Sequence, residues 1–143
     1  MEVEYTFIGG PELKRALAEL PKAMERKVSR QALRMGAKVL QKHIKATLPV
    51  DAVTPDGVHL NKSVGIFRPW QRSQRRQIML HVGYSGLART YGHIIEFGNS
   101  RIQPNPVWRR AITAVGSEVV QTVVDKLAKD TLRETARLFK RTI

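Results

Sequence analysis

The sequence contains no cysteine among its 143 residues. Disulfide scaffolds, thiolate zinc sites, iron–sulfur clusters and cysteine nucleophiles are therefore excluded. Acidic residues are also scarce, because 12 Asp and Glu stand against 25 Lys and Arg, which gives a formal net charge of +13. This imbalance makes a polyanion or an acidic protein surface the first partner to consider.

Long apolar runs are missing as well. A helix that spans a bilayer needs about 20 consecutive apolar residues, whereas the longest candidate, residues 119–124, is short and interrupted by polar side chains. The acidic, alternating amino terminus also differs from the basic and then apolar start of a signal peptide. We therefore expect a single domain over residues 1–143 that is made in the cytoplasm and has no membrane partner.

Two segments have the periodicity of long helices. In residues 21–48, apolar side chains recur at spacings of three and four and form one broad face, and Lys and Arg fill much of the remainder. In the last third of the chain, an apolar stripe begins at Val107 and is expected to continue through Leu132 and Ala136. Just before it, Asn105 is suited to the N-cap and Pro106 to the first helical turn.

The remaining segments predict a small sheet and one short helix. Residues 2–8 alternate between apolar and polar side chains, as a half-buried strand does, and residues 11–20 favour a short helix. Residues 63–67 and 77–83 predict two further strands, and the apolar island at 91–98 could add another. The fold class predicted is α+β, with an antiparallel sheet packed by a long helix in the N-terminal half and a long C-terminal helix.

The segment between the two central strands is the most basic local feature. It holds five residues that combine guanidinium groups with a ring able to stack on a base, namely Arg68, Trp70, Arg72, Arg75 and Arg76. Residues 61–110 as a whole hold nine Lys and Arg against one acid. We interpret this hairpin tip as an element that faces DNA or an acidic partner, and a merely solvated loop remains the alternative.

Signals of catalysis are weak. His93 and Glu96 lie three residues apart, which on a helix could bring two metal ligands together, but no third ligand is evident. Neither a Gly-x-Ser-x-Gly elbow nor a phosphate-binding glycine loop is present in the sequence. We expect no enzyme, no metal and no cofactor. Instead, we expect Glu96 to accept backbone N–H groups at a chain reversal where Gly98 has a positive φ.

A longer pattern covers residues 91–112. It reads Tyr-Gly-His-Ile-Ile-Glu-Phe-Gly-Asn-Ser and then, from Pro104, Pro-Asn-Pro-Val-Trp-Arg-Arg-Ala-Ile. This pattern resembles the signature of a phage tail-completion family, the head–tail joining proteins of long-tailed phages. In that family a Glu-Phe-Gly-Thr element precedes a proline-containing turn and a Pro-Phe-φ-Arg-Pro-Ala start of the last helix. Here Asn99 replaces the Thr, and Arg110 replaces the second Pro.

The resemblance extends upstream. The stretch from Leu17 to Pro21 matches a Leu-x-x-Leu-Pro junction between two helices. Residues 48–51 match part of an Ala-Pro-Val-Asp-Thr-Gly loop, whose glycine comes late here, at Gly57. The residues that carry the resemblance as a fold and assembly motif are Tyr91, Glu96, Phe97, Gly98, Pro104, Pro106 and Trp108.

The resemblance implies a structural role and a location in the virion. It implies a fold related to tail terminators and a ring of identical subunits, expected to be a hexamer, at the head-proximal end of the tail. Its partners would be neighbouring tail-terminator, head-completion (stopper) and tail proteins, together with the double-stranded DNA in the channel. The alternative from the residues alone is a small basic nucleic-acid-binding protein, which predicts tight, salt-dependent binding by the isolated chain.

Overall fold

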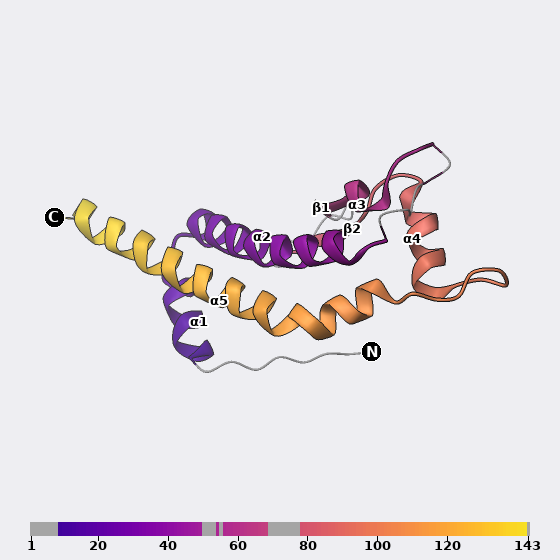
Figure 1. The fold of residues 1–143 in the computed structure, drawn as a ribbon. Coiled ribbons are helices and arrows are strands. Elements are labelled where there is room, and N and C mark those ends of the chain that lie inside the picture. Colours follow the sequence, from indigo (N-terminus) through magenta and orange to yellow (C-terminus); the bar gives the residue numbers. More distant parts are fainter. Residues whose placement is uncertain (1–8, 50–53, 55, 69–77, 143) are drawn as a thin grey trace.

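The computed structural model of the chain describes residues 9–49, 54, 56–68 and 78–142. Helices dominate it, and a two-stranded antiparallel sheet completes an α+β fold (Figure 1). In chain order the elements are α1 (Gly10–Ala18), α2 (Lys22–Thr47), α3 (Leu60–Ser63), β1 (Val64–Phe67), β2 (His81–Tyr84), α4 (Ala88–Phe97) and α5 (Val107–Thr142).

The two long helices form the frame of the molecule. They lie side by side and run in opposite directions, so the start of α2 lies beside the later part of α5 (Figure 1). The buried residues Val28 and Ala32 belong to the apolar face predicted for α2. Within this contact, Gly36 on α2 faces Val119 and Val123 on α5. The absence of a side chain at Gly36 is what allows this approach.

Replacing Gly36 by Val is expected to push the two helices apart. A Cβ at this position would overlap the Val123 side chain and lie 3.1 Å from the Val119 carbonyl oxygen. Overpacking of this kind costs about 1–3 kcal/mol of the free energy of unfolding, which urea denaturation followed by circular dichroism measures. Ala46→Val, at an exposed position of the same helix, is the control and should cost less than about 0.7 kcal/mol. Equal losses in the two variants would contradict the close packing.

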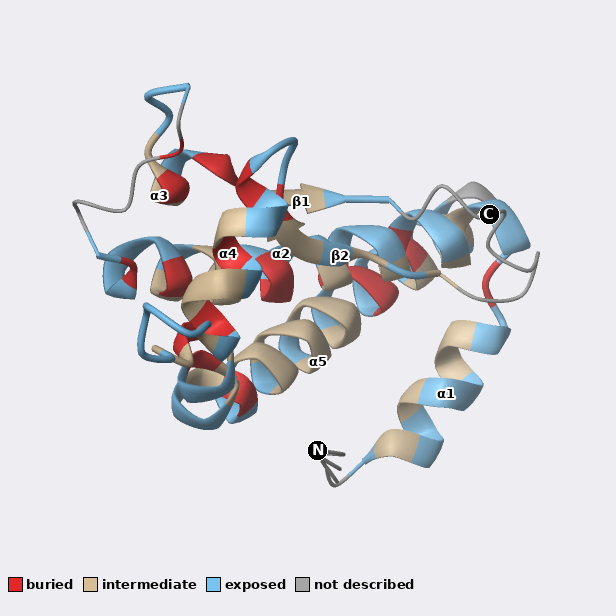
Figure 2. Cartoon of the chain, turned by 90° about the vertical axis from the view of Figure 1, so that its right-hand side faces the viewer, coloured by how far each residue is buried: buried red, intermediate tan, exposed pale blue. Residues whose placement is uncertain are grey.

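The main hydrophobic core lies at the end of the helix pair where α2 finishes and α5 starts. It joins buried residues from α2, the following segment, α3, both strands, α4 and α5, as the buried positions in Figure 2 indicate. These residues are Ile44, Leu48, Leu60, Val64, Tyr84, Ala88, Val107 and Ala111. The core therefore fixes the start of α5 against the hairpin and α4, and the motif of residues 91–112 lies at this point.

The antiparallel hairpin predicted from the sequence is confirmed, with shorter strands. Val64 pairs with Tyr84 and Phe67 with His81, and the Gln41 side-chain amide on α2 donates a hydrogen bond of 2.8 Å to the Val64 carbonyl. Of the hairpin tip, the structure describes Arg68, which is exposed. The predictions for Trp70, Arg72, Arg75 and Arg76, and for a strand over residues 2–8, lie outside the described residues.

The prediction of a further strand at 91–98 is wrong, because this segment is helix α4. Its buried residues are Ala88, Gly92 and Glu96, which recur every four positions and lie on one face of a helix. The apolar island shows only the last part of this pattern, since the helix begins upstream at Ala88.

The terminal helix is confirmed, but its predicted apolar stripe ends early. Leu132 is 70% exposed and Ala136 is also exposed, whereas Asp130 and Glu134 are buried. Lys126 lies 3.1 Å from the Asp130 carboxylate and Arg137 lies 3.0 Å from that of Glu134. Buried carboxylates are tolerated on this face because cations of the next or previous helical turn pair with them.

Candidate functional site

The family-like motif forms the junction between α4 and α5, and Glu96 is its centre. The Glu96 side chain is almost fully buried, and its carboxylate accepts the backbone N–H groups of Trp108 at 3.0 Å and Arg109 at 3.3 Å. The first N–H groups of a helix have no partner within the helix, and they carry a partial positive charge that favours an anion. Glu96 therefore caps α5 from another helix, as an acceptor at a chain reversal is expected to do.

A tight turn brings Glu96 to the start of α5. Gly98 ends α4 with φ 72° and ψ 179°, a backbone conformation that glycine adopts readily, and its N–H donates a 2.7 Å bond to the Ile94 carbonyl. The Asn99 side chain then accepts the N–H groups of Arg101 and Ile102. The chain returns so that the Asn105 N–H donates to the Ile95 carbonyl at 2.7 Å.

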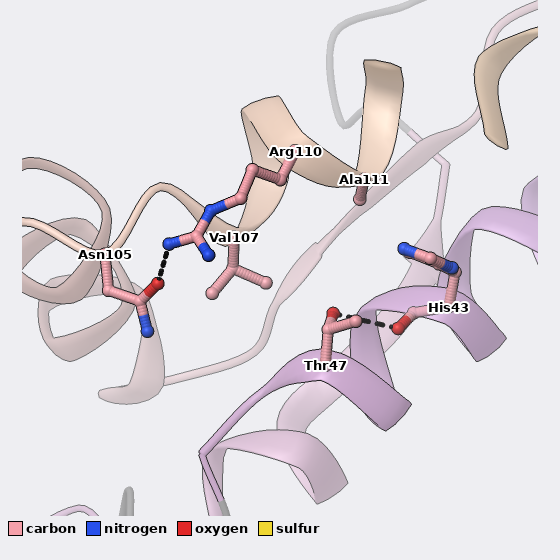
Figure 3. A pocket seen from close by; sticks show the side chains of 6 residues that line it. All are labelled: His43, Thr47, Asn105, Val107, Arg110 and Ala111. Atoms are coloured by element: carbon pink, nitrogen blue, oxygen red, sulfur yellow. Dashed lines mark hydrogen bonds between the residues drawn. The ribbon is translucent and has the colours of Figure 1, made fainter. Parts of the chain in front are cut away.

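The predicted N-cap role of Asn105 is wrong. Its side-chain oxygen accepts a hydrogen bond from the Arg110 guanidinium (Figure 3), while the backbone donors that an N-cap would take are bonded to Glu96. Pro106 directly precedes α5, and its carbonyl accepts the Arg110 N–H. The cap comes from Glu96, eleven positions before the helix start at Val107, which no local capping pattern would reveal.

On the side that faces the hydrophobic core, aromatic side chains pack against the junction between α4 and α5. The Tyr84 and Trp108 rings meet edge to face, with centroids 5.5 Å apart. Gly92 lies against the Tyr84 ring, which leaves no room for a Cβ there. Burial raises the pKa of Tyr84 above its ordinary value, and the Glu96 carboxylate acts in the same direction while Trp108 opposes it. Tyr91 packs half-buried against the same core.

The outer side of the junction is exposed. Phe97 is 54% exposed, and its ring lies 5.2 Å from the Arg109 guanidinium and 4.7 Å from the His93 ring. Arg109 also lies 3.8 Å from the Glu96 carboxylate. This surface holds an aromatic ring and a cation in a fixed arrangement, which suits contact with another macromolecule.

The structure places His93 and Glu96 in separate environments. The His93 ring packs on Phe97, while the Glu96 carboxylate is bonded to the backbone of α5. Among the residues that the structure describes, no group of three His, Asp or Glu side chains could hold a metal ion.

Two pockets formed by described residues lie along the two long helices. One of about 80 Å³ lies between the end of α2 and the start of α5, lined by residues such as His43, Thr47 and Arg110 (Figure 3). Another, of about 290 Å³, lies further along the helix pair beside Glu25 and Ser29. Sites for small molecules typically enclose about 300–1,000 Å³, so the first pocket is far below that range and the second is close to its lower end. Within the described part of the chain, no helix is both long and apolar enough to cross a membrane.

Comparison with known proteins identifies a class of phage tail proteins. Residues 11–98 match the family described as "Bacteriophage HK97-gp10, putative tail-component". The match covers more than half of the chain, which therefore belongs to this family of phage tail components, and it places the protein in the virion. Searches of curated proteins and of solved structures returned no match.

The matched region ends at Gly98, so it includes α4 and its capping carboxylate but not the helix that is capped. Sequence reasoning identified Glu96, Gly98 and Trp108, and it missed the contributions of Tyr84, Gly92 and Arg109. Tyr84 and Gly92 form a contact between β2 and α4. Such a contact between positions far apart in the sequence leaves no periodic signal in a single sequence.

Proposed function

We propose that this tail component is a structural, non-enzymatic protein of the phage neck, which forms a ring at the head-proximal end of the tail and joins tail to head around the DNA channel. The observation that carries the proposal is the family match over residues 11–98. A sixfold ring, a fold related to tail terminators, and contacts with terminator, stopper and tail proteins are parts of the same proposal.

The shape of the helix pair supports assembly through α5. At 1.5 Å per residue, the 36 residues of α5 extend about 54 Å, whereas the 26 residues of α2 extend about 39 Å. The end of α5 therefore projects beyond its partner helix (Figure 1). Leu132 and Phe139, seven residues apart on one face, are 70% and 69% exposed. Exposed apolar side chains on a projecting helix favour a protein contact.

Charge supports a location next to polyanions. Each subunit carries a net charge of +13, and six copies in one ring would repel each other strongly without compensation. DNA in the channel and acidic neighbours would both supply that compensation. A channel position explains this charge better than a free monomer does.

Deletion of the gene from its phage is expected to give filled heads and complete tails that are not joined, with a loss of infectious particles of several orders of magnitude. Electron microscopy of lysates and plaque counts measure these outcomes, and expression of the wild-type protein in trans should restore joining. Normal particle yield from the deletion would contradict the proposal and favour a separate nucleic-acid-binding role.

A variant pair tests whether the end of α5 is the assembly surface. Leu132→Asp with Phe139→Asp should leave the thermal unfolding of the dilute protein unchanged, because both side chains are exposed, yet fail to restore joining. Val58→Asp with Met79→Asp, at positions 44% and 48% exposed, is the control and should restore it.

A further inference from the structure

The outer face of α2 carries a continuous row of cations. Its exposed members recur at spacings of three and four along the helix, and we call this row the α2 cationic stripe: Lys27, Arg30, Arg34, Lys38, Lys42 and Lys45. At 100° per residue the six side chains fall within an arc of about 120°, and at 1.5 Å per residue they span about 27 Å. They form a single straight stripe of positive charge.

No acid of the helix lies on this stripe. The one acidic residue of α2, Glu25, is half-buried and lies about 160° from Lys27 around the helix axis. Within the described residues, none of the six cations has a hydrogen-bond or ion-pair partner. The acids that do form ion pairs, Glu96, Asp130 and Glu134, pair with cations of α5.

The fold presents this stripe outward because the opposite side of α2 is already used. Val28, Ala32 and Gly36 lie on that opposite side and are buried. Like charges four residues apart destabilise a helix, so the row carries a cost that folding does not require. A polyanionic partner would offset that cost.

The composition of the stripe favours nucleic acid over protein. The centres of protein interfaces are depleted in Lys and enriched in aromatic residues, whereas the stripe has four Lys, two Arg and no aromatic residue. Lys acts as a compact point charge suited to a phosphate, and contacts of this kind to the phosphate backbone do not read sequence. Of the large exposed apolar side chains, Met35 is the one on α2, and it lies at the edge of the stripe.

We propose that the α2 cationic stripe is the surface that contacts the phosphate backbone of double-stranded DNA, without sequence preference. This inference rests on the proposed function, since the DNA that passes the neck would be its partner. In a ring, the stripe of each subunit would line the channel.

The test uses the full-length protein and a random-sequence DNA duplex, with fluorescence anisotropy at a series of NaCl concentrations. Each neutralised phosphate contributes about 0.9 to the slope of log K against log salt. Arg34→Gln with Lys38→Gln and Lys42→Gln should therefore reduce the slope by about 2–3 and weaken binding at least tenfold at low salt.

Two further variants make the result specific to the stripe. Lys14→Gln with Arg15→Gln and Lys62→Gln removes the same charge from exposed positions elsewhere and should change the slope by less than 1. The charge-conserving set Arg34→Lys, Lys38→Arg and Lys42→Arg should bind as the wild type does. Equal effects of the two neutralising sets, or a wild-type slope for the stripe variant, would overturn the proposal.

Particle assembly separates this proposal from the proposed function. If deletion leaves heads and tails unjoined while the stripe variant binds DNA like the wild type, the stripe proposal fails and the neck function stands. If a stripe variant that binds DNA like the wild type nevertheless fails to restore joining, the stripe faces an acidic protein instead of DNA. If the deletion phage assembles normally but the stripe variant loses DNA affinity, the neck function fails and the stripe proposal stands.

Discussion

Replacing Glu96 by Ala is expected to lower the free energy of unfolding by about 2–4 kcal/mol. The substitution leaves two N–H groups of α5 without their acceptor, and an unpaired buried donor costs about 1–3 kcal/mol. It also removes the negative charge that the helix N-terminus favours. For a chain of this size the loss corresponds to a fall in melting temperature of about 5–15 °C.

Two other variants define the cause of that loss. Glu96→Gln keeps one oxygen acceptor and should lose about half as much as Glu96→Ala. Glu118→Ala removes an exposed acid from the same helix and should stay within about 0.5 kcal/mol of the wild type. Thermal unfolding followed by circular dichroism, at one protein concentration for all variants, measures the three values. A Glu96→Ala protein as stable as the Glu118→Ala protein would contradict the capping role.

Replacing Gly98 by Ala is expected to cost about 3 kcal/mol or more, for two separate reasons. The positive φ of 72° is strained for any residue with a side chain, at about 1–3 kcal/mol. In addition, a Cβ would lie 2.7 Å from the Ile102 carbonyl oxygen and 2.9 Å from the Pro104 ring. Relief of these contacts would move the turn and draw Glu96 away from the start of α5.

Matched glycines separate strain from steric overlap. Gly57 also has a positive φ, of 77°, but its Cβ would meet nothing within 4 Å, so Gly57→Ala should show the cost of strain alone. Gly83 has neither feature, and Gly83→Ala should stay within about 0.5 kcal/mol of the wild type. Urea denaturation gives all three values, and a loss at Gly98 no greater than that at Gly57 would exclude the steric contribution.

The sequence by itself predicted the elements whose signals are local. The apolar spacing of residues 21–48 and of those after Val107 indicated α2 and α5, because each helix must bury one face. The short runs at residues 63–67 and 77–83, on either side of the basic segment 68–76, indicated β1 and β2. The Glu-Phe-Gly motif was also sufficient to predict a carboxylate that accepts backbone N–H groups beside a glycine with positive φ, since few other arrangements need both residue types together.

Only the tertiary structure decided which helix that carboxylate caps, because the acceptor and the donors belong to different elements. Local pattern assigned the cap to Asn105, but the turn at Gly98 brings Glu96 closer to the free N–H groups of Trp108 and Arg109. The tertiary structure also decided where the apolar stripe of α5 stops, since the burial of Asp130 depends on which segments pack against that part of the helix. The element that covers the apolar face of α2 was decided in the same way. Packing against α5 buries one face, and the row of cations on the opposite face is therefore left in solvent.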